Sequence, residues 1–201
     1  FDDENRSVML EEEGMALDLG GIAKGYAAAL AGEIYREADI RTALISIGGN
    51  IYCWGAPKGQ DAYRIGVRDP QGDAGDPLLI MSLTDKIIAS SGAYERYFEY
   101  EGTIYHHIID PQSLFPATYY HQVTIVTENS GYADALSTAL FTMSYDDGLA
   151  LIDRFRQTYP DQPIEVMWVM DPDQVPSGVN SVMSGEYAVV MTDSMKDYLA
   201  Q

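Results

Sequence analysis

The sequence predicts an α+β fold, a mostly antiparallel sheet with packed helices, built as a single domain over residues 1–201. Residues 63–68 alternate apolar and polar side chains, which is typical of a strand with one buried face. Two helical segments, 132–143 and 146–159, follow each other directly. A regular βαβ series would instead place a strand between them.

The first helix is predicted to run from residue 22 to about residue 35. An apolar strand end at residues 16–19 is expected to lead into it through Gly20 and Gly21. The helix should bury one stripe of apolar residues that recur every four positions, namely Ile22, Tyr26, Leu30 and Ile34.

The remaining elements follow from apolar runs bounded by turn residues. Strands are predicted at 42–51, 63–68, 78–83, 87–90, 122–126, 164–170 and 187–191. A hairpin of residues 94–100 and 103–108 should turn at Glu101 and Gly102, a polar loop should cover 70–77, and a short acidic helix should span 193–199.

Composition excludes some classes of function. The formal net charge is -19, and 12 Lys plus Arg are too few for a basic groove, so we expect no nucleic-acid partner. The acidity itself mainly serves solubility. Cys53 is the only cysteine and lies in an apolar run, which excludes a disulfide framework and predicts a buried thiol. No run approaches the roughly 20 apolar residues that span a bilayer.

The segment 16–26 joins an apolar run to a glycine pair and then to a helix. The first N–H groups of a helix have no partners within it, and the helix dipole is positive there, so this start can hold a diphosphate. Gly20 and Gly21 would let the ligand approach the backbone. The alternative is a tight turn that only packs the helix on the sheet.

Asp134, Ser137 and Thr138 fall on one face of a predicted helix, because residues three and four apart are neighbours there. One carboxylate and two hydroxyls suit a hard cation such as Mg²⁺, which takes few protein oxygens together with phosphate oxygens and water. An acid near a helix start is, alternatively, a dipole partner or cap.

His107 ends the predicted hairpin, where an imidazole, a side chain that exchanges protons near neutral pH, could orient or deprotonate a nucleophile. The alternative is a histidine that anchors the turn through hydrogen bonds to the backbone. His106 should point to the opposite face and be structural.

Five segments occur in a specific order: 16–26, 42–51, 91–97, 105–111 and 133–140. With them the chain resembles the ApbE family, the FAD:protein FMN transferases once called thiamine biosynthesis lipoproteins. The resemblance is dense over residues 17–143 and implies an ApbE-like domain related to the T-fold. It also implies that the glycine turn, His107 and the helix of Asp134 converge on one cleft.

The resemblance assigns roles to individual residues. The metal ligands would be the Ala23 carbonyl, Asp134, Ser137 and Thr138, and Asp134 and His107 would be catalytic. Gly20, Lys24 and Tyr26 would hold the cofactor, and Ile108 would touch the flavin. The implied reaction is Mg²⁺-dependent transfer of FMN from FAD to a Ser or Thr hydroxyl of a partner protein, a redox flavoprotein subunit, with release of AMP.

Two positions depart from the family pattern. Leu114 stands where members usually have a glycine, which predicts a different turn because Leu tolerates positive φ poorly. Asn50 replaces the usual acid after the second glycine pair. The Leu114 departure keeps open a non-catalytic FAD-binding or storage protein. Two further alternatives are an FAD pyrophosphatase, which would use the same site with water as acceptor, and a purely structural extracellular domain, which the intact set of Asp134, Ser137 and Thr138 disfavours.

The chain is also expected to lack the family's N-terminal segment, since it begins close to the glycine motif. A lipoprotein signal would lie upstream, which implies an extracytoplasmic protein whose membrane contact is a lipid anchor. Because the missing segment supplies adenine contacts in the family, we expect weak FAD binding by this chain alone.

Overall fold

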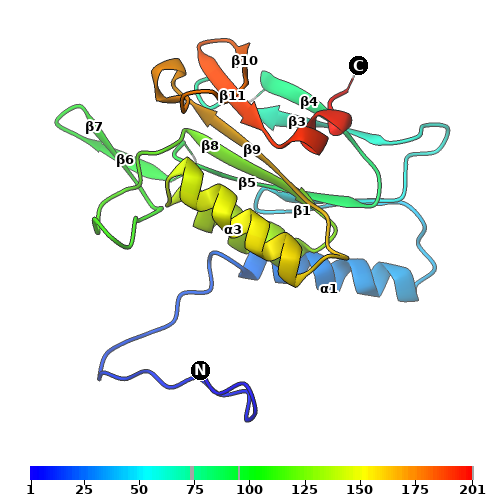
Figure 1. Ribbon diagram of the computed structural model, residues 1–201. Helices are drawn as coiled ribbons and strands as arrows, with labels where there is room; N and C mark the ends of the chain where they lie inside the picture. The colour runs from blue at the N-terminus through cyan, green and yellow to red at the C-terminus, as the bar shows by residue number, and fades with distance from the viewer. Residues whose placement is uncertain (73–74, 95, 201) are drawn as a thin grey trace.

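The computed structural model describes residues 1–72, 75–94 and 96–200. Asp73 and Ala74 of the predicted polar loop, Glu95 of the 91–97 motif and Gln201 lie outside the described residues. The α+β prediction is confirmed: every strand pair is antiparallel, and helices pack on the central sheet (Figure 1).

The central sheet has seven strands in the order β1-β2-β5-β8-β9-β11-β10. Their bounds are β1 Ala43–Ile47, β2 Asn50–Trp54, β5 Lys86–Gly92, β8 Gln122–Thr127, β9 Ile164–Met170, β10 Ser181–Ser184 and β11 Tyr187–Met191. Two hairpins stand apart from it: β3 Tyr63–Arg68 with β4 Pro77–Leu83, and β6 Tyr97–Tyr100 with β7 Thr103–His106.

Three α-helices, α1 Ala23–Glu37, α2 Ser130–Phe141 and α3 Tyr145–Thr158, lie on one side of this sheet (Figure 1). Side chains cap α2 and α3: Asn129 accepts a hydrogen bond from the Tyr132 N–H, and Ser144 accepts one from the Asp147 N–H. Two 3₁₀ helices, η1 Pro172–Gln174 and η2 Asp193–Tyr198, complete the elements. Among the residues that the structure describes, no helix has the length and apolarity to cross a bilayer.

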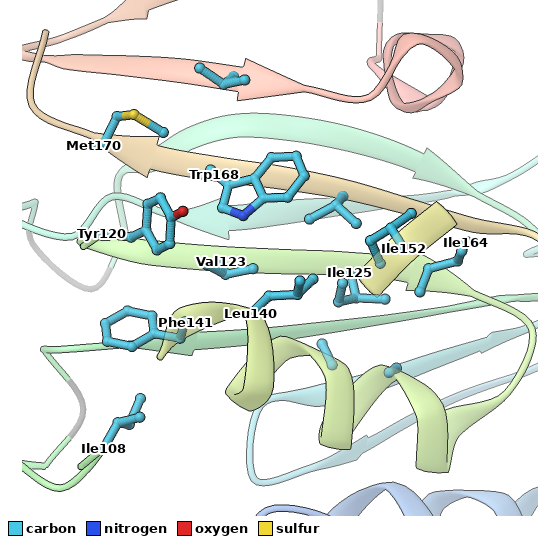
Figure 2. Close-up of a cluster of buried hydrophobic side chains, with 14 of the residues drawn as sticks. Ile108, Tyr120, Val123, Ile125, Leu140, Phe141, Ile152, Ile164, Trp168 and Met170 are labelled. Atoms are coloured by element: carbon cyan, nitrogen blue, oxygen red, sulfur yellow. The ribbon is translucent and has the colours of Figure 1, made fainter. Parts of the chain in front are cut away.

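The centre of the sheet is buried on both faces, whereas the edge strand β10 is mostly exposed. The central strand β8 is buried along its whole length, as its run of β-branched residues favours. Figure 2 shows the cluster on the helix side, where Leu140 and Phe141 of α2 and Ile152 of α3 meet Val123 and Trp168 of the sheet. The second cluster lies between the other face and the elements β3, β4 and η2.

The observed strands differ from the predicted ones in several places. The segment 42–51 is not one strand but most of a hairpin, since Gly48 and Gly49 turn β1 back into β2. β4 and β5 flank the turn at residues 84–85, yet β4 pairs with β3 and β5 joins the central sheet. β10 was not predicted, and the 193–199 segment is a 3₁₀ helix. The 94–100/103–108 hairpin is confirmed in the shorter form β6–β7.

The predicted strand end at residues 16–19 is wrong. Leu17 and Leu19 are exposed, and the segment carries no strand assignment. A strand needs the backbone groups of a neighbouring strand, and the part of the chain that the structure describes places none beside this segment.

The predicted buried stripe of α1 is also wrong. Its four residues, Ile22, Tyr26, Leu30 and Ile34, are 43%, 64%, 42% and 61% exposed. The helix instead buries Gly25, Ala28 and Gly32. Small residues are needed on that face because α1 lies close to its neighbours: a Cβ added at Gly32 would stand 2.8 Å from the Tyr52 ring. Close packing therefore overrode the apolar periodicity.

Candidate functional site

The glycine motif meets the Asp134 helix at the start of α1. The Gly25 N–H donates a hydrogen bond to Asp134 Oδ2 over 2.9 Å. The approach is so close that a Cβ at Gly25 would lie 2.1 Å from the Ser130 carbonyl oxygen. Asp134 is only 2% exposed, so α1 and α2 enclose its carboxylate. The two motifs therefore lie on the same side of the molecule, as predicted.

Lys24 is the cationic partner of this buried carboxylate. Its Nζ lies 2.8 Å from Asp134 Oδ1 and 3.0 Å from the carbonyl oxygen of Gly20. A buried carboxylate is costly without a partner, and here Lys24 and the Gly25 N–H engage both of its oxygens. One side chain thus joins the glycine turn to α2.

Two hydroxyls extend the site along α2. Ser137 Oγ and Thr138 Oγ1 each donate to the Asp134 carbonyl, over 3.0 Å and 3.3 Å. Thr138 Oγ1 would also lie 3.9 Å from a Cβ placed on Gly21. Asp134, Ser137 and Thr138 therefore share one helix face, and that face lies next to the glycine turn.

The alternative role of Asp134, as a helix cap or dipole partner, is found at the start of α1 and not at the start of α2. Asn129, not Asp134, caps α2. Asp134 instead accepts an N–H from the first turn of α1, so it occupies part of the helix start that was predicted to hold a diphosphate. A phosphate group and the Asp134 carboxylate would both face this end of α1.

The chemistry of the donor set fits a hard cation. One carboxylate, two hydroxyls and the carbonyl of Ala23, the first residue of α1, are all oxygen donors. The described residues contain no group of three His, Cys, Asp or Glu that could hold a metal, so a cation here would depend on the hydroxyls and the carbonyl. Lys24 already places positive charge on Asp134.

His107 is exposed at the base of the β6–β7 hairpin. Its backbone N–H donates to the Arg96 carbonyl over 3.0 Å, and its ring Nδ1 lies 3.3 Å from the same oxygen. If Nδ1 carries the proton for that contact, Nε2 keeps a free lone pair. Within the described ranges no hydrogen bond or ion pair links His107 to Asp134, so their convergence on one cleft stays a prediction.

His106 anchors the turn, as expected for the structural member of the pair. It is buried, with Nε2 2.8 Å from the Ala117 carbonyl oxygen and Nδ1 accepting the Ile108 N–H over 3.3 Å. Burial lowers the pKa of His106.

The Ile108 side chain is also buried in the helix-side cluster of Figure 2. Tyr26, one of the residues predicted to hold the cofactor, is exposed.

The two departures from the family pattern can be placed. Leu114 has φ 61°, the left-handed conformation that glycine adopts freely and that Leu tolerates poorly. The Leu114 N–H bonds the Asp110 carbonyl, and the Asp110 N–H bonds the Phe115 carbonyl, which together hold the turn. Asn50 is buried beside the Gly48–Gly49 turn.

Sequence reasoning missed one member of the site, Ser91 of β5. Its Oγ lies 2.9 Å from Ser137 Oγ and 3.2 Å from Thr138 Oγ1. The residue belongs to the 91–97 motif, but a single serine before a glycine carries no signal of its role without the position of α2.

The fold and this site define an α+β protein in which a glycine-opened helix meets a carboxylate and hydroxyl cluster on a second helix. The model of the ApbE family matches residues 1–160. The chain therefore belongs to the ApbE family, as its motifs predicted.

Relatives and solved structures agree. The chain is 40% identical over 158 residues to an FAD:protein FMN transferase of Treponema pallidum, covering 74% of this chain and 44% of the relative. It is 36% identical over 153 residues to one from Klebsiella pneumoniae, covering 76% and 46%. The crystal structure of the ApbE protein from Thermotoga maritima superposes with a TM-score of 0.77 at 34% identity, covering 100% of this chain and 59% of that one. The chain thus spans less than half the length of these curated relatives.

Proposed function

We propose that this chain forms the α1–α2 site of an FAD:protein FMN transferase, which moves FMN from FAD to a Ser or Thr hydroxyl of a partner protein and releases AMP. The relatives' names support flavin transfer to a protein. The observation that carries the proposal is the buried Asp134 carboxylate, which the Gly25 N–H and Lys24 hold at the glycine-opened start of α1. The Ser137 and Thr138 hydroxyls lie on the same face of α2, bonded to the Asp134 backbone carbonyl.

The proposed cofactor is Mg²⁺, held by the Ala23 carbonyl, Asp134, Ser137 and Thr138. When bound, Mg²⁺ neutralises charge on the FAD diphosphate. The support is the all-oxygen donor set and its position beside Gly21, where a diphosphate would meet the N–H groups of α1. Lys24 would then shift its ammonium group from Asp134 toward phosphate oxygens, since both positions need a cation.

The rest of the step is assigned to this chain's own residues. Gly20, Lys24 and Tyr26 hold FAD, and the buried residue Ile108 shapes the flavin side of the site. The acceptor hydroxyl oxygen forms a bond to the FMN-side phosphorus, and the bond from that phosphorus to the bridging oxygen breaks, so AMP leaves with that oxygen. His107 Nε2 orients the hydroxyl and takes its proton. Positioning and charge neutralisation dominate such transfers, so loss of Asp134 should cost more than loss of His107.

The proposed partner is a redox flavoprotein subunit that carries the acceptor residue. A position outside the cytoplasm and a lipid anchor remain predictions from the family resemblance. FAD hydrolysis with water as acceptor, and FAD binding without reaction, are the competing outcomes of the experiment below.

The test is flavinylation of an acceptor protein by a chain of the relatives' full length, followed by mass spectrometry and product analysis. We expect an FMN mass on the acceptor, AMP in solution and loss of both in EDTA.

Asp134→Asn should abolish transfer and His107→Ala should slow it, while Asp153→Asn, an exposed acid on α3, serves as the matched control. Transfer at the wild-type rate by Asp134→Asn with EDTA present would overturn the metal mechanism. FMN and AMP without an acceptor adduct would indicate a hydrolase.

A further inference from the structure

Ser91 lies where β5 passes under α2, and its hydroxyl bridges two side chains of that helix. Its Oγ is 2.9 Å from Ser137 Oγ and 3.2 Å from Thr138 Oγ1. The preceding residue, Ser90, bonds instead to Thr124 Oγ1 on β8 over 2.8 Å. Because successive strand residues face opposite sides of a sheet, only Ser91 reaches the α2 site.

The number of hydroxyl protons limits the possible directions of these hydrogen bonds. A hydroxyl has one proton and two lone pairs. The Ser137 and Thr138 hydroxyls each lie within hydrogen-bond distance of the backbone carbonyl oxygen of Asp134, which can only accept. In the arrangement in which both α2 hydroxyls donate to the Asp134 backbone carbonyl, Ser91 is the donor to them, and its one proton is shared between the two oxygens or held by one. Each α2 hydroxyl that donates to Asp134 keeps a lone pair for another partner.

Ser91 belongs to β5, a third element beside α1 and α2. Its contacts restrict the side chains of both predicted cation ligands on α2, Ser137 and Thr138. An isolated Ser or Thr side chain on a helix rotates among staggered positions, and its lone pairs turn with it. Ser91 and the Asp134 carbonyl together hold the Ser137 and Thr138 oxygens from two sides. Partners of this kind, which orient metal ligands without touching the ion, contribute substantially to metal affinity.

We propose that Ser91 is a positioning residue for the divalent cation at the α1–α2 site: its hydroxyl orients the Ser137 and Thr138 oxygens toward the ion. The inference rests on the proposed function, because it assumes that these two oxygens bind a cation. It assigns Ser91 no contact with FAD or with the acceptor.

The test measures cation affinity directly, with no dependence on turnover. Mn²⁺ serves as the probe in place of Mg²⁺, and electron paramagnetic resonance reports the free ion during a titration. The wild-type chain should show a site that Asp134→Asn removes. Ser91→Ala should weaken Mn²⁺ binding about tenfold, the lower end of the usual effect of such partners. Ser90→Ala is the matched control and should change the affinity less than twofold, and Ser91→Thr, which keeps the hydroxyl, should restore it.

A second variant covers the case in which Ser91→Ala lowers the thermal unfolding midpoint. Ser91→Cys nearly keeps the side-chain volume but replaces the hydroxyl with a weak donor, so it should still weaken Mn²⁺ binding. Equal affinities for wild type, Ser91→Ala and Ser91→Cys, with loss only in Asp134→Asn, would overturn the role of Ser91 and leave the proposed function intact. Absence of Mn²⁺ binding by the wild type would overturn both. An equal loss in Ser90→Ala would show a general effect on the sheet and overturn the inference.

Discussion

Lys24 Nζ and Asp134 Oδ1 lie 2.8 Å apart, and this ion pair joins α1 to α2 although strands β1 to β8 separate the two helices in the chain. Asp134 is buried and Lys24 is partly exposed, with side-chain exposures of 2% and 36%. The pair therefore links the glycine turn to the carboxylate of the site, and both stability and ligand binding should depend on it.

Lys24→Met should lower the free energy of unfolding by about 1–3 kcal/mol, because it leaves a buried carboxylate with only the Gly25 N–H. Urea denaturation followed by circular dichroism measures this change. Lys196→Met is the control, since Lys196 pairs with the exposed Asp193 at 3.6 Å and should contribute less than about 1 kcal/mol. Equal effects of the two variants would mean that Asp134 does not need its cation.

Gly25→Ala should lower the free energy of unfolding by about 3 kcal/mol, because the new Cβ would stand 2.1 Å from a backbone oxygen of α2 and the helices would have to separate. Gly21→Ala is a suitable comparison, since its Cβ would lie 3.9 Å from Thr138 Oγ1, an ordinary contact distance. Thermal unfolding of both variants is the measurement. A Gly25→Ala chain as stable as Gly21→Ala would contradict the close helix contact.

Leu114→Gly should raise the free energy of unfolding by about 1 kcal/mol, because glycine adopts φ 61° without the steric cost that Leu bears. The Leu114 side chain is 75% exposed, so little packing is lost. Leu114→Ala is the control: it removes the side chain but keeps the Cβ, and should change stability little. A loss of stability in the glycine variant would show that the left-handed turn is not strained.

Stability should fall in mild acid through His106. Burial lowers the pKa of this imidazole from its ordinary value of 6.5. Below pH 6.5 the unfolded chain therefore binds a proton that folded His106 resists, and the free energy of unfolding decreases as pH falls, by at most about 1.4 kcal/mol per pH unit. Urea denaturation at several pH values, compared between wild type and His106→Gln, isolates this contribution. The glutamine variant should show the shallower slope, and identical slopes would contradict the buried neutral ring.

The sequence by itself determined most of the local elements and the kinds of side chain that the candidate site contains. Apolar alternation located β3, because one face of a half-buried strand takes every second side chain, and an apolar run bounded by turn residues located β8. Helical spacing placed Asp134, Ser137 and Thr138 on one face, because three- and four-residue separations are neighbours on any helix. Family motifs predicted that the glycine turn lies beside this face, and the contacts of Gly25 and Lys24 confirm it.

Only the tertiary structure decided which partners these residues take. Whether the apolar stripe of α1 or its small-residue face is buried depends on how closely α2 and Tyr52 approach, which no periodicity within α1 records. In the same way, Ser91 gains its partners only because β5 passes under α2. Contacts between elements far apart in the chain arise from packing, and local sequence does not encode them.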